Sequence, residues 1–518
     1  MKRLVLLLMV LACVKGYSAE RPQERLVLDE FIVKNVSWCE TRLDNVHYIM
    51  TSGGPLSVQV YLEGRKINLR LKNENTRELT YYIRCNGFVH PENEPVGKEK
   101  VDKEYTYTKQ LAAGKEDVYT IGHRSMITVI GHGGVPDEAK DLDKAYRDML
   151  YAGFDVSFWN GRIINTGKMM KAAHRQGIKL IAGGGNLSSY KTLADSVIKY
   201  KETVYGYYIG DEPFLKKNDR YKNHVIISDL IPRVKAVCDV DPDAHIRICL
   251  NPIYGPESIN PDGSYNNQKY AEYIDSCVTR LGLRTLNFDN YSVMWSKGDE
   301  VLRRQWFDNL EIIRSQSLKH KIPFCGYVLS AQHLIYTMPT LGTMRLQMYA
   351  NLAYGAKSIA YYTYWHRWMR GEGQYAAPID TFGQRRAELY ENVNRVNEEM
   401  ARISSLFAEG TVKEVYHING APSNELVNHL TADRLPKNVE SLSIEGNKSA
   451  IASIIEKGDS AFLAIVNKDF RNPIRLHING NNKLYHVSKC TLKNEPITIG
   501  DYTIEAGDII IFNFQQRK

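Results

Sequence analysis

The sequence lacks three patterns, and each absence excludes a class of protein. Its eight cysteines never form a Cys-x-x-Cys pair, which argues against a zinc knuckle and against a disulfide-built scaffold. Beyond the first 19 residues, no apolar run approaches the ~20 residues of a membrane-spanning helix. The net charge of +8 is spread along the chain without a dense Lys/Arg block, so no nucleic-acid partner is predicted.

What is present is the composition of an ordinary globular protein with an excess of tyrosine. At 518 residues the chain is too long for one domain, and two or three are expected. Its 33 tyrosines supply flat amphipathic rings that stack on sugars or bases, although tyrosine is also a common strand residue. The excess is therefore compatible with a sugar-binding protein without requiring one.

Residues 1–19 have the pattern of a secretory signal. Lys2 and Arg3 precede an apolar stretch from Leu4 to Ala12, and small residues follow. The preceding Val10-Leu-Ala and Cys13 resemble the lipobox of bacterial lipoproteins, so lipid attachment at Cys13 and ordinary cleavage are both open. The predicted location is outside the cytoplasm, either periplasmic or at the outer membrane or cell surface of a bacterium.

The body of the chain divides into three parts by its hydrophobic pattern. Residues 20–122 show short runs with period two, such as Leu56–Leu62 and Leu79–Arg84, which predict an antiparallel β domain. Residues 123–405 alternate strand and helix patterns. Residues 406–518 return to strand patterns such as Ser460–Val466, and predict a second small β domain, a β-sandwich.

The middle part predicts a (β/α)8 TIM barrel, because an alternating repeat of this length closes most easily as eight units. The expected strands are Met126–Gly131, Phe154–Trp159, Ile178–Ala182, Val204–Gly210, Ile246–Leu250, Thr285–Asp289, Ile322–Leu329 and Ser358–Tyr364. The expected helices include Asp137–Tyr151, Thr166–Gln176, Asp299–Ser317 and Met344–Tyr354. A doubly wound sheet is the competing fold, but no glycine-rich phosphate turn follows the first strand. No cofactor is predicted.

The stretch Val204–Pro213 is the strongest candidate for chemistry. It is an apolar, aromatic strand that leads directly into Asp211 and Glu212, and the following proline cannot continue the strand. Catalytic groups of TIM barrels lie at the carboxyl ends of the strands, so this pair is a candidate for acid/base catalysis. A surface turn is the alternative interpretation of an isolated Asp-Glu-Pro.

Other strand ends carry aromatic rings and amides, which suit a substrate with many hydroxyl groups. The expected substrate-binding residues are His132, Trp159, Asn186, Asn251, Tyr291, Gln332 and Trp365. His132 could equally be a structural partner of a nearby carboxylate. No metal site is predicted, because the histidines lack zinc-ligand spacing.

With these residues placed, the chain resembles the clan A glycoside hydrolases, a group of (β/α)8 enzymes, over roughly residues 124–518. In that group the fourth strand ends in a polar residue, then the general acid/base Glu and often Pro, which Asp211-Glu212-Pro213 matches with Asp in place of the usual Asn. Trp365 matches the tryptophan that ends strand eight and floors a sugar subsite. The segment from Pro378 to Asn397 is similar to the last helix of beta-galactosidase and agarase-like members. The resemblance implies an enzyme that cleaves a glycosidic bond of an oligo- or polysaccharide, with Glu212 as general acid.

One departure from the family leaves the second catalytic group open. Clan A enzymes carry a nucleophilic Glu at the end of strand seven, but the segment 326–333 offers Gln332 and no carboxylate. A retaining double displacement needs a second carboxylate at about 5 Å from the acid. Asp289, at the end of the sixth expected strand, could act as nucleophile or as base, or could only fix a loop.

Two further possibilities stay open. The adjacent Asp211 and Glu212 resemble the pair of the family 20 and 123 hexosaminidases, in which Glu protonates the leaving oxygen and Asp orients the attacking 2-acetamido group of the substrate. That resemblance implies an N-acetylhexosamine substrate and needs no enzyme nucleophile. The third possibility is a lipoprotein that binds glycans without catalysis.

Overall fold

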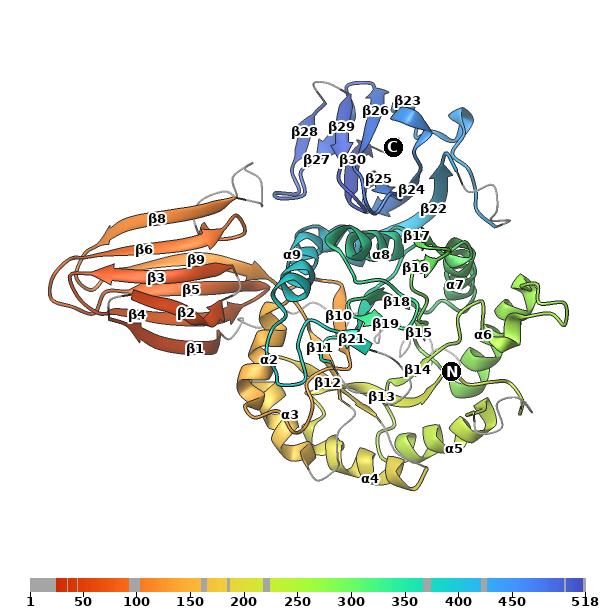
Figure 1. Cartoon of the computed structure of the whole chain (residues 1–518), viewed down its shortest axis with the longest axis horizontal. Helices are drawn as coiled ribbons and strands as arrows, with labels where there is room; N and C mark the ends of the chain where they lie inside the picture. Colours follow the sequence, from red (N-terminus) through yellow and green to blue (C-terminus); the bar gives the residue numbers. More distant parts are fainter. Residues whose placement is uncertain are drawn as a thin grey trace, which may run out of the picture.

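The computed structural model shows three parts that follow one another along the chain (Figure 1). It describes residues 25–34, 36–43, 45–92, 103–159, 165–183, 187–217, 224–366, 374–420, 426–497 and 500–515. The expected signal with Cys13 lies outside these residues, as does Asn186. Trp159 ends a strand, but its side chain is also outside the description.

The N-terminal part consists of two antiparallel sheets, as expected. One sheet has the order β1 (Leu26–Val33), β4 (Leu56–Glu63), β5 (Lys66–Lys72), β9 (Glu116–His123) and β7 (His90–Pro91). The other has the order β2 (Val36–Leu43), β3 (Val46–Ser52), β6 (Leu79–Asn86) and β8 (Glu104–Leu111). The period-two pattern is visible in β6, where Leu79, Tyr81 and Ile83 are buried and the residues between them are more exposed.

The middle part is an eight-stranded parallel barrel, which confirms the predicted fold. Its strands are β10 (Thr128–His132), β11 (Val156–Trp159), β12 (Lys179–Gly183), β13 (Val204–Asp211), β14 (Ile246–Cys249), β15 (Leu286–Asn287), β18 (Phe324–Leu329) and β20 (Ser358–Tyr362). They are ordered β14-β13-β12-β11-β10-β20-β18-β15 in the sheet. A parallel bridge between Leu250 and Phe288 joins the two outer strands and closes the ring.

Helices surround the barrel and alternate with its strands. They are α2 (Leu142–Tyr151), α3 (Thr166–Arg175), α4 (Leu187–Val197), α5 (Ile227–Cys238), α6 (Asn267–Leu281), α7 (Trp306–His320), α8 (Leu341–Ala353) and α9 (Ala387–Glu409). Single 3-10 turns occur at Ile198–Tyr200, Pro256–Ser258, Ala432–Arg434 and Glu445–Asn447. No helix in the described part of the chain is both long enough and apolar enough to cross a membrane.

Two short two-stranded antiparallel sheets interrupt the barrel repeat. One joins β16 (Val293–Ser296) to β17 (Asp299–Leu302), and the other pairs β19 (Gln332–His333) with β21 (Gln374–Ala376). The expected helix Asp299–Ser317 was therefore wrong in its first turns, because residues 299–302 pair with β16 and the helix begins only at Trp306.

The C-terminal part is a β-sandwich, as expected. Its larger sheet has the order β22 (Thr411–Ile418), β24 (Ala450–Lys457), β25 (Ser460–Asn467), β30 (Ile509–Gln515), β27 (Leu484–Val487) and β28 (Asn494–Pro496). The smaller sheet has the order β23 (Val439–Ile444), β26 (Ile474–Gly480) and β29 (Asp501–Ile504). Leu463, Leu476 and Phe512 meet in the core between the two sheets.

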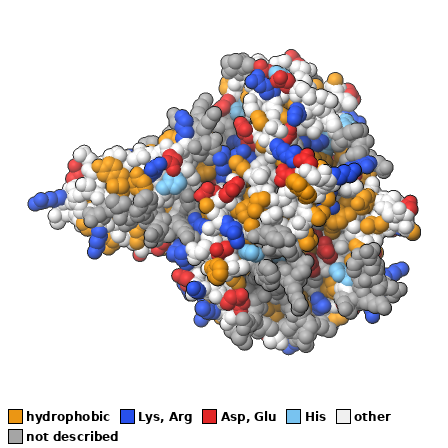
Figure 2. All heavy atoms as spheres, viewed as in Figure 1, with side chains coloured by type: hydrophobic (Ala, Val, Ile, Leu, Met, Phe, Trp, Pro, Cys, Tyr) orange, Lys and Arg blue, Asp and Glu red, His pale blue; other side chains and the backbone are white. Residues whose placement is uncertain are grey.

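Both flanking domains rest on the last helices of the barrel (Figure 1). The ring Nδ1 and the backbone N of His123, at the end of β9, lie 2.8 Å and 2.9 Å from the two carboxylate oxygens of Glu398 on α9. The hydroxyl of Ser453 on β24 donates to the carbonyl oxygen of Ala353 at the end of α8, at 2.7 Å. On the face seen in Figure 2, acidic and basic side chains are interspersed, in keeping with the modest net charge.

Candidate active site

Three carboxyl groups converge at the carboxyl ends of two barrel strands. Asp211 is the last residue of β13, Glu212 follows it, and Asp289 lies two residues after the end of β15. The side chain of Asp289 hydrogen-bonds with Glu212 and feels the negative charge of Asp211. The two predicted strand ends therefore meet, although β14 lies between them in the sheet.

The pKa of the Asp289 carboxyl group is raised toward neutral pH. Burial raises its pKa most, the charge of Asp211 raises it further, and hydrogen bonds with Cys249 and Glu212 lower it in part, so that the pKa is about 7. The Oδ1 atom of Asp289 is buried and has no hydrogen-bond partner in the structure. Two neighbouring carboxyl groups that cannot both ionise easily share a proton, as acid catalysis requires.

The backbone of Glu212 is held in an unusual conformation by three hydrogen bonds. Its φ of 42° lies in the left-handed region, which costs a non-glycine residue about 1–3 kcal/mol. Its N–H donates to the carbonyl oxygen of Cys249 at 2.8 Å. Its carbonyl oxygen accepts from the side-chain amide of Asn251 at 3.0 Å and from the Nε2 of His224 at 2.6 Å. These contacts turn the chain sharply at the strand end and fix where the Glu212 carboxyl group is presented.

The hydrogen bonds of Asn251 hold the backbone of Glu212 in place. It is 3% exposed, and its amide donates to the carbonyl oxygens of both Glu212 and Pro213. Its backbone N–H donates in turn to the hydroxyl of Tyr273 at 3.0 Å. The structure thus shows it positioning Glu212, whereas the sequence suggested a direct contact with substrate.

Asp211 is also oriented by a neighbour. The hydroxyl of Tyr208, three residues earlier on β13, donates to the Oδ1 of Asp211 at 2.6 Å. Tyr208 packs against Phe158 and His132, so its ring cannot swing freely. Asp211 itself is exposed, and its carboxylate is presented to solvent with one oxygen already bonded.

Aromatic rings fill the interior of the barrel beneath the carboxyl groups. His132, at the end of β10, lies 3.0 Å from the hydroxyl of Tyr327 through its Nδ1 and contacts the ring of Tyr362. Tyr291 is 5% exposed and packs edge-on against Tyr336 with ring centroids 5.1 Å apart. His132 and Tyr291 therefore belong to one continuous aromatic floor.

A second cluster, formed by residues of three loops, lies beside the carboxyl groups. The sequence analysis did not predict it. The guanidinium of Arg303 donates to the hydroxyl of Tyr336 at 3.0 Å and lies 4.1 Å from the ring centre of Tyr254. The two tyrosine hydroxyls are 3.2 Å apart. Burial raises the pKa of Tyr336, and the charges of Asp289 and Glu212 act on the same hydroxyl. These loop residues show no periodicity, so no sequence pattern could have identified them.

Two more predicted residues, Trp365 and Gln332, follow strands β20 and β18. Strand β20 ends at Tyr362, and Trp365 follows three residues later. Trp365 is 8% exposed and lines a groove beside helix α2. Gln332 begins the short strand β19, where it pairs with Ala376. Between Leu329 and His333 the chain carries no carboxylate, so the second carboxyl group of the site comes from strand β15.

No set of three or more histidine, cysteine or acidic side chains that could hold a metal ion occurs among the described residues. The chemistry available to the described side chains at this site is proton transfer, by carboxyl groups, and hydrogen bonding, by tyrosine, histidine and arginine. Such a set suits acid-catalysed cleavage of a bond to a poor leaving group.

Comparison with known proteins identifies solved structures with a similar fold. The sequence matches no protein-family model and no curated protein at a significant level. A GH42 beta-galactosidase from G. stearothermophilus has a TM-score of 0.51 at 8% identity, over 75% of this chain and 98% of that chain. A catalytic mutant of that enzyme has the same TM-score at 7% identity and the same coverage. A beta-galactosidase from Bacillus circulans sp. alkalophilus gives a TM-score of 0.47 at 10% identity, over 75% of this chain and 99% of that chain.

At these identities the likeness concerns the fold. The expected resemblance to (β/α)8 glycoside hydrolases of the beta-galactosidase type is confirmed at that level. The comparisons give no support to the hexosaminidase-like interpretation of Asp211-Glu212-Pro213, which therefore rests on the residues alone.

Proposed function

We propose that this protein is a glycoside hydrolase that cleaves an oligo- or polysaccharide, with Glu212 as the proton donor. The observation that carries the proposal is the pairing of Glu212 with Asp289, whose pKa of about 7 keeps a proton in the pair near neutral pH. A glycosidic oxygen is a poor leaving group, and a protonated carboxyl group at the mouth of the barrel supplies what it needs. A protein that only binds glycans has no use for such a pair.

The contact between Asp289 and Glu212 bears on the mechanism. Opposed carboxyl groups stand about 5 Å apart in retaining glycosidases and about 6.5–9.5 Å apart in inverting ones. Asp289 lies next to Glu212 and its Oδ1 atom is buried, so it is better suited to supporting the acid than to attacking the sugar from the opposite face. The attacking group must then come from elsewhere.

One specific observation favours substrate assistance as the second step of the proposal. Asp211 is exposed beside Glu212 and is oriented by the 2.6 Å bond from Tyr208. A carboxylate fixed in this way can accept the N–H of a 2-acetamido group of the substrate. The carbonyl oxygen of that acetamido group then attacks the anomeric carbon. Glu212 would protonate the departing oxygen in the same step, and water would then open the ring of the intermediate.

Hydrolysis of aryl glycosides tests both levels of the proposal. Activity on any aryl glycoside that is lost in Glu212→Gln supports a glycosidase. Activity confined to 2-acetamido sugars and blocked by a thiazoline mimic supports substrate assistance, whereas activity on 2-hydroxy sugars excludes it. A folded protein without turnover on any of these substrates would favour the binding-protein alternative.

The exported location remains a prediction that rests on residues 1–19. Mass spectrometry of the mature protein from its native membrane fraction distinguishes a lipid-modified N-terminal Cys13 from simple cleavage at a later residue. Neither result changes the proposed reaction.

A further inference from the structure

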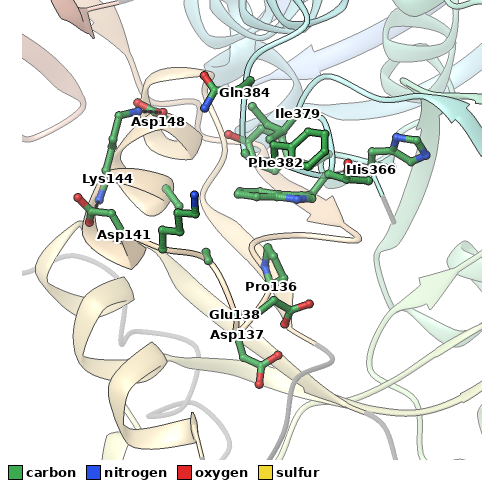
Figure 3. A pocket seen from close by; sticks show the side chains of 17 residues that line it. Pro136, Asp137, Glu138, Asp141, Lys144, Asp148, His366, Ile379, Phe382 and Gln384 are labelled. Carbon is green, nitrogen blue, oxygen red and sulfur yellow. Dashed lines mark hydrogen bonds and ion pairs between the residues drawn. The ribbon is translucent and has the colours of Figure 1, made fainter. Parts of the chain in front are cut away.

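A groove of about 830 Å³ lies between helix α2 and the segment that carries Phe382 (Figure 3). Its walls come from the segment after β10, from helix α2, and from the segments on either side of Ile379 that follow β20. The carboxyl groups follow β13 and β15, which lie on another part of the ring. A volume of this size is within the range of about 300–1,000 Å³ typical of small-molecule sites.

An exposed phenylalanine stands at the edge of this groove. Phe382 is 83% exposed, the largest exposed fraction among the large hydrophobic side chains of the described residues. The exposed ring of Phe382 offers a flat apolar face on which a ligand can stack. The ring faces the groove opposite the side chains of α2 in Figure 3.

The turn that carries Phe382 is rigid. A carboxylate oxygen of Asp380 accepts the backbone N–H groups of Phe382 and Gln384, both at 2.8 Å. Gly383 has a φ of 81° and rests on Trp365, since a Cβ at this position would lie 3.1 Å from the indole ring. The turn is therefore packed on the buried indole, which fixes the backbone that carries Phe382.

The opposite wall is polar and negatively charged. The acidic side chains that line the groove are Asp137, Glu138, Asp141 and Asp148, and the basic ones are Lys140 and Lys144. Lys144 is engaged by Asp148 at 2.7 Å, and Asp148 also accepts from Arg385 at 3.1 Å. Asp141 and Asp137 also accept hydrogen bonds, from the backbone N–H of Lys144 and from the side-chain amide of Asn165. The four carboxylates outnumber Lys140, Lys144 and Arg385 by one; their remaining lone pairs can accept from hydroxyl groups, and the net negative charge repels sulfate and uronate groups.

We infer that this groove binds a neutral oligosaccharide, with Phe382 as the stacking platform and the carboxylates of the opposite wall as hydroxyl acceptors. An aromatic face next to hydrogen-bond acceptors matches the two faces of a sugar ring. The segments that line the groove follow β10 and β20 and therefore lie at the same end of the barrel as Glu212, so the ligand of this proposal is a chain long enough to reach both places. This inference rests on the proposed glycosidase function and narrows its substrate to uncharged glycan chains.

The test compares Phe382→Ala with the full-length parent on two substrates, an aryl glycoside that the parent cleaves and a panel of soluble neutral polysaccharides including galactan, xylan and agaro-oligosaccharides. Phe382→Ala should keep kcat/KM on the aryl glycoside within about twofold and lose about tenfold on the polysaccharide, the value of one aromatic stacking contact. Leu318→Ala, which removes an exposed side chain from α7, serves as the control and should change neither value. Thermal unfolding confirms that each variant is folded.

The outcomes separate the two proposals. If turnover of the aryl glycoside does not depend on Glu212, the proposed function fails. If it does depend on Glu212, but Phe382→Ala cleaves polysaccharides as the parent does, only the groove inference is overturned. The groove inference is also overturned if the parent cleaves no polysaccharide of the panel, or if sulfated carrageenan binds Glu212→Gln more tightly than the neutral chains do.

Discussion

The side-chain amide of Asn251 donates to the carbonyl oxygen of Glu212 at 3.0 Å, and so links the strand that carries the proposed acid to the strand beside it. Because Glu212 has a left-handed backbone, this bond and the one from His224 offset conformational strain at the point where the chain turns. The position of the acid is thus determined by residues from two other segments of the chain.

Asn251→Ala should lower kcat more than it raises KM. Loss of the amide leaves two buried carbonyl oxygens poorly satisfied, which costs about 1–3 kcal/mol of stability and lets Glu212 relax from its position. Asn467→Ala is a matched control, because Asn467 is equally buried and its amide also donates to backbone carbonyl oxygens, but in the C-terminal domain. Steady-state kinetics and thermal unfolding are measured for both variants. If Asn251→Ala and Asn467→Ala lose the same activity at the same loss of stability, Asn251 has only a structural role.

Asp289→Asn should stabilise the protein at high pH and not at low pH. The folded-state pKa of Asp289, about 7, is raised above the unfolded value near 4, so its contribution to stability is present in acid and is lost as the pH rises through 7. The uncharged amide avoids this loss, a gain of up to about 4 kcal/mol at pH 8. Thermal unfolding at pH 4.5 and pH 8 measures the difference, and the exposed Asp239→Asn is the control.

The same substitution should move the alkaline limb of kcat/KM to lower pH. Without a second negative charge beside it, Glu212 loses its proton more readily, so activity disappears earlier as the pH rises. A pH profile identical to that of the parent would show that Asp289 does not share a proton with the catalytic acid.

Much of the architecture followed from the hydrophobic pattern, because each barrel strand is an apolar run that ends in polar residues. The runs from Val204 and Ser358 predicted β13 and β20 to within two residues at either end. The sequence also placed Asp289 at the same end of the barrel as Glu212. It could not show that the two side chains meet, because this depends on the small Cys249 of the intervening strand β14, whose thiol contacts Asp289.

The sequence pattern could not predict which loop residues contribute to the candidate site. His224 and Arg303 come from segments without periodicity, and their partners lie in distant parts of the chain. The hairpin β16–β17 was not predicted for a related reason. Strand β17 has only four residues and precedes a long helix, so its period-two pattern is too short to be distinguished from the helix pattern. Trp365 was expected to end strand eight, but the strand stops at Tyr362.

Tyr208→Phe tests the proposed role of Asp211. Loss of the 2.6 Å hydrogen bond removes one contact that orients the Asp211 carboxylate, which should reduce kcat by about 3- to 10-fold. If Asp211 holds a 2-acetamido group, the reduction should be large on 2-acetamido glycosides and absent on any 2-hydroxy glycoside that is also cleaved. Uniform loss on both kinds of substrate would contradict that role, and Tyr82→Phe in the N-terminal domain controls for the removal of a hydroxyl.

Glu399→Gln should lower the free energy of unfolding of the protein. Burial alone would raise the pKa of Glu399, but Arg345 lowers it to about 2, and removal of one partner from such a buried pair costs about 3–5 kcal/mol. A depressed pKa gives stability that is present above the unfolded value and lost in acid, so parent and variant should become similar toward pH 2. Lys235→Ala removes an exposed ion pair and should change stability by no more than about 1 kcal/mol.

The central claim, that Glu212 donates the proton, is tested most directly by the dependence of Glu212→Gln on the leaving group. A series of aryl glycosides of one sugar, with phenols of increasing pKa, is hydrolysed by the parent and by the variant. Phenols of low pKa leave without help, so the variant should lose little kcat/KM on them and about 100-fold or more on phenols of high pKa. An equal loss across the series, or no loss at all, would contradict the assignment of Glu212 as the general acid.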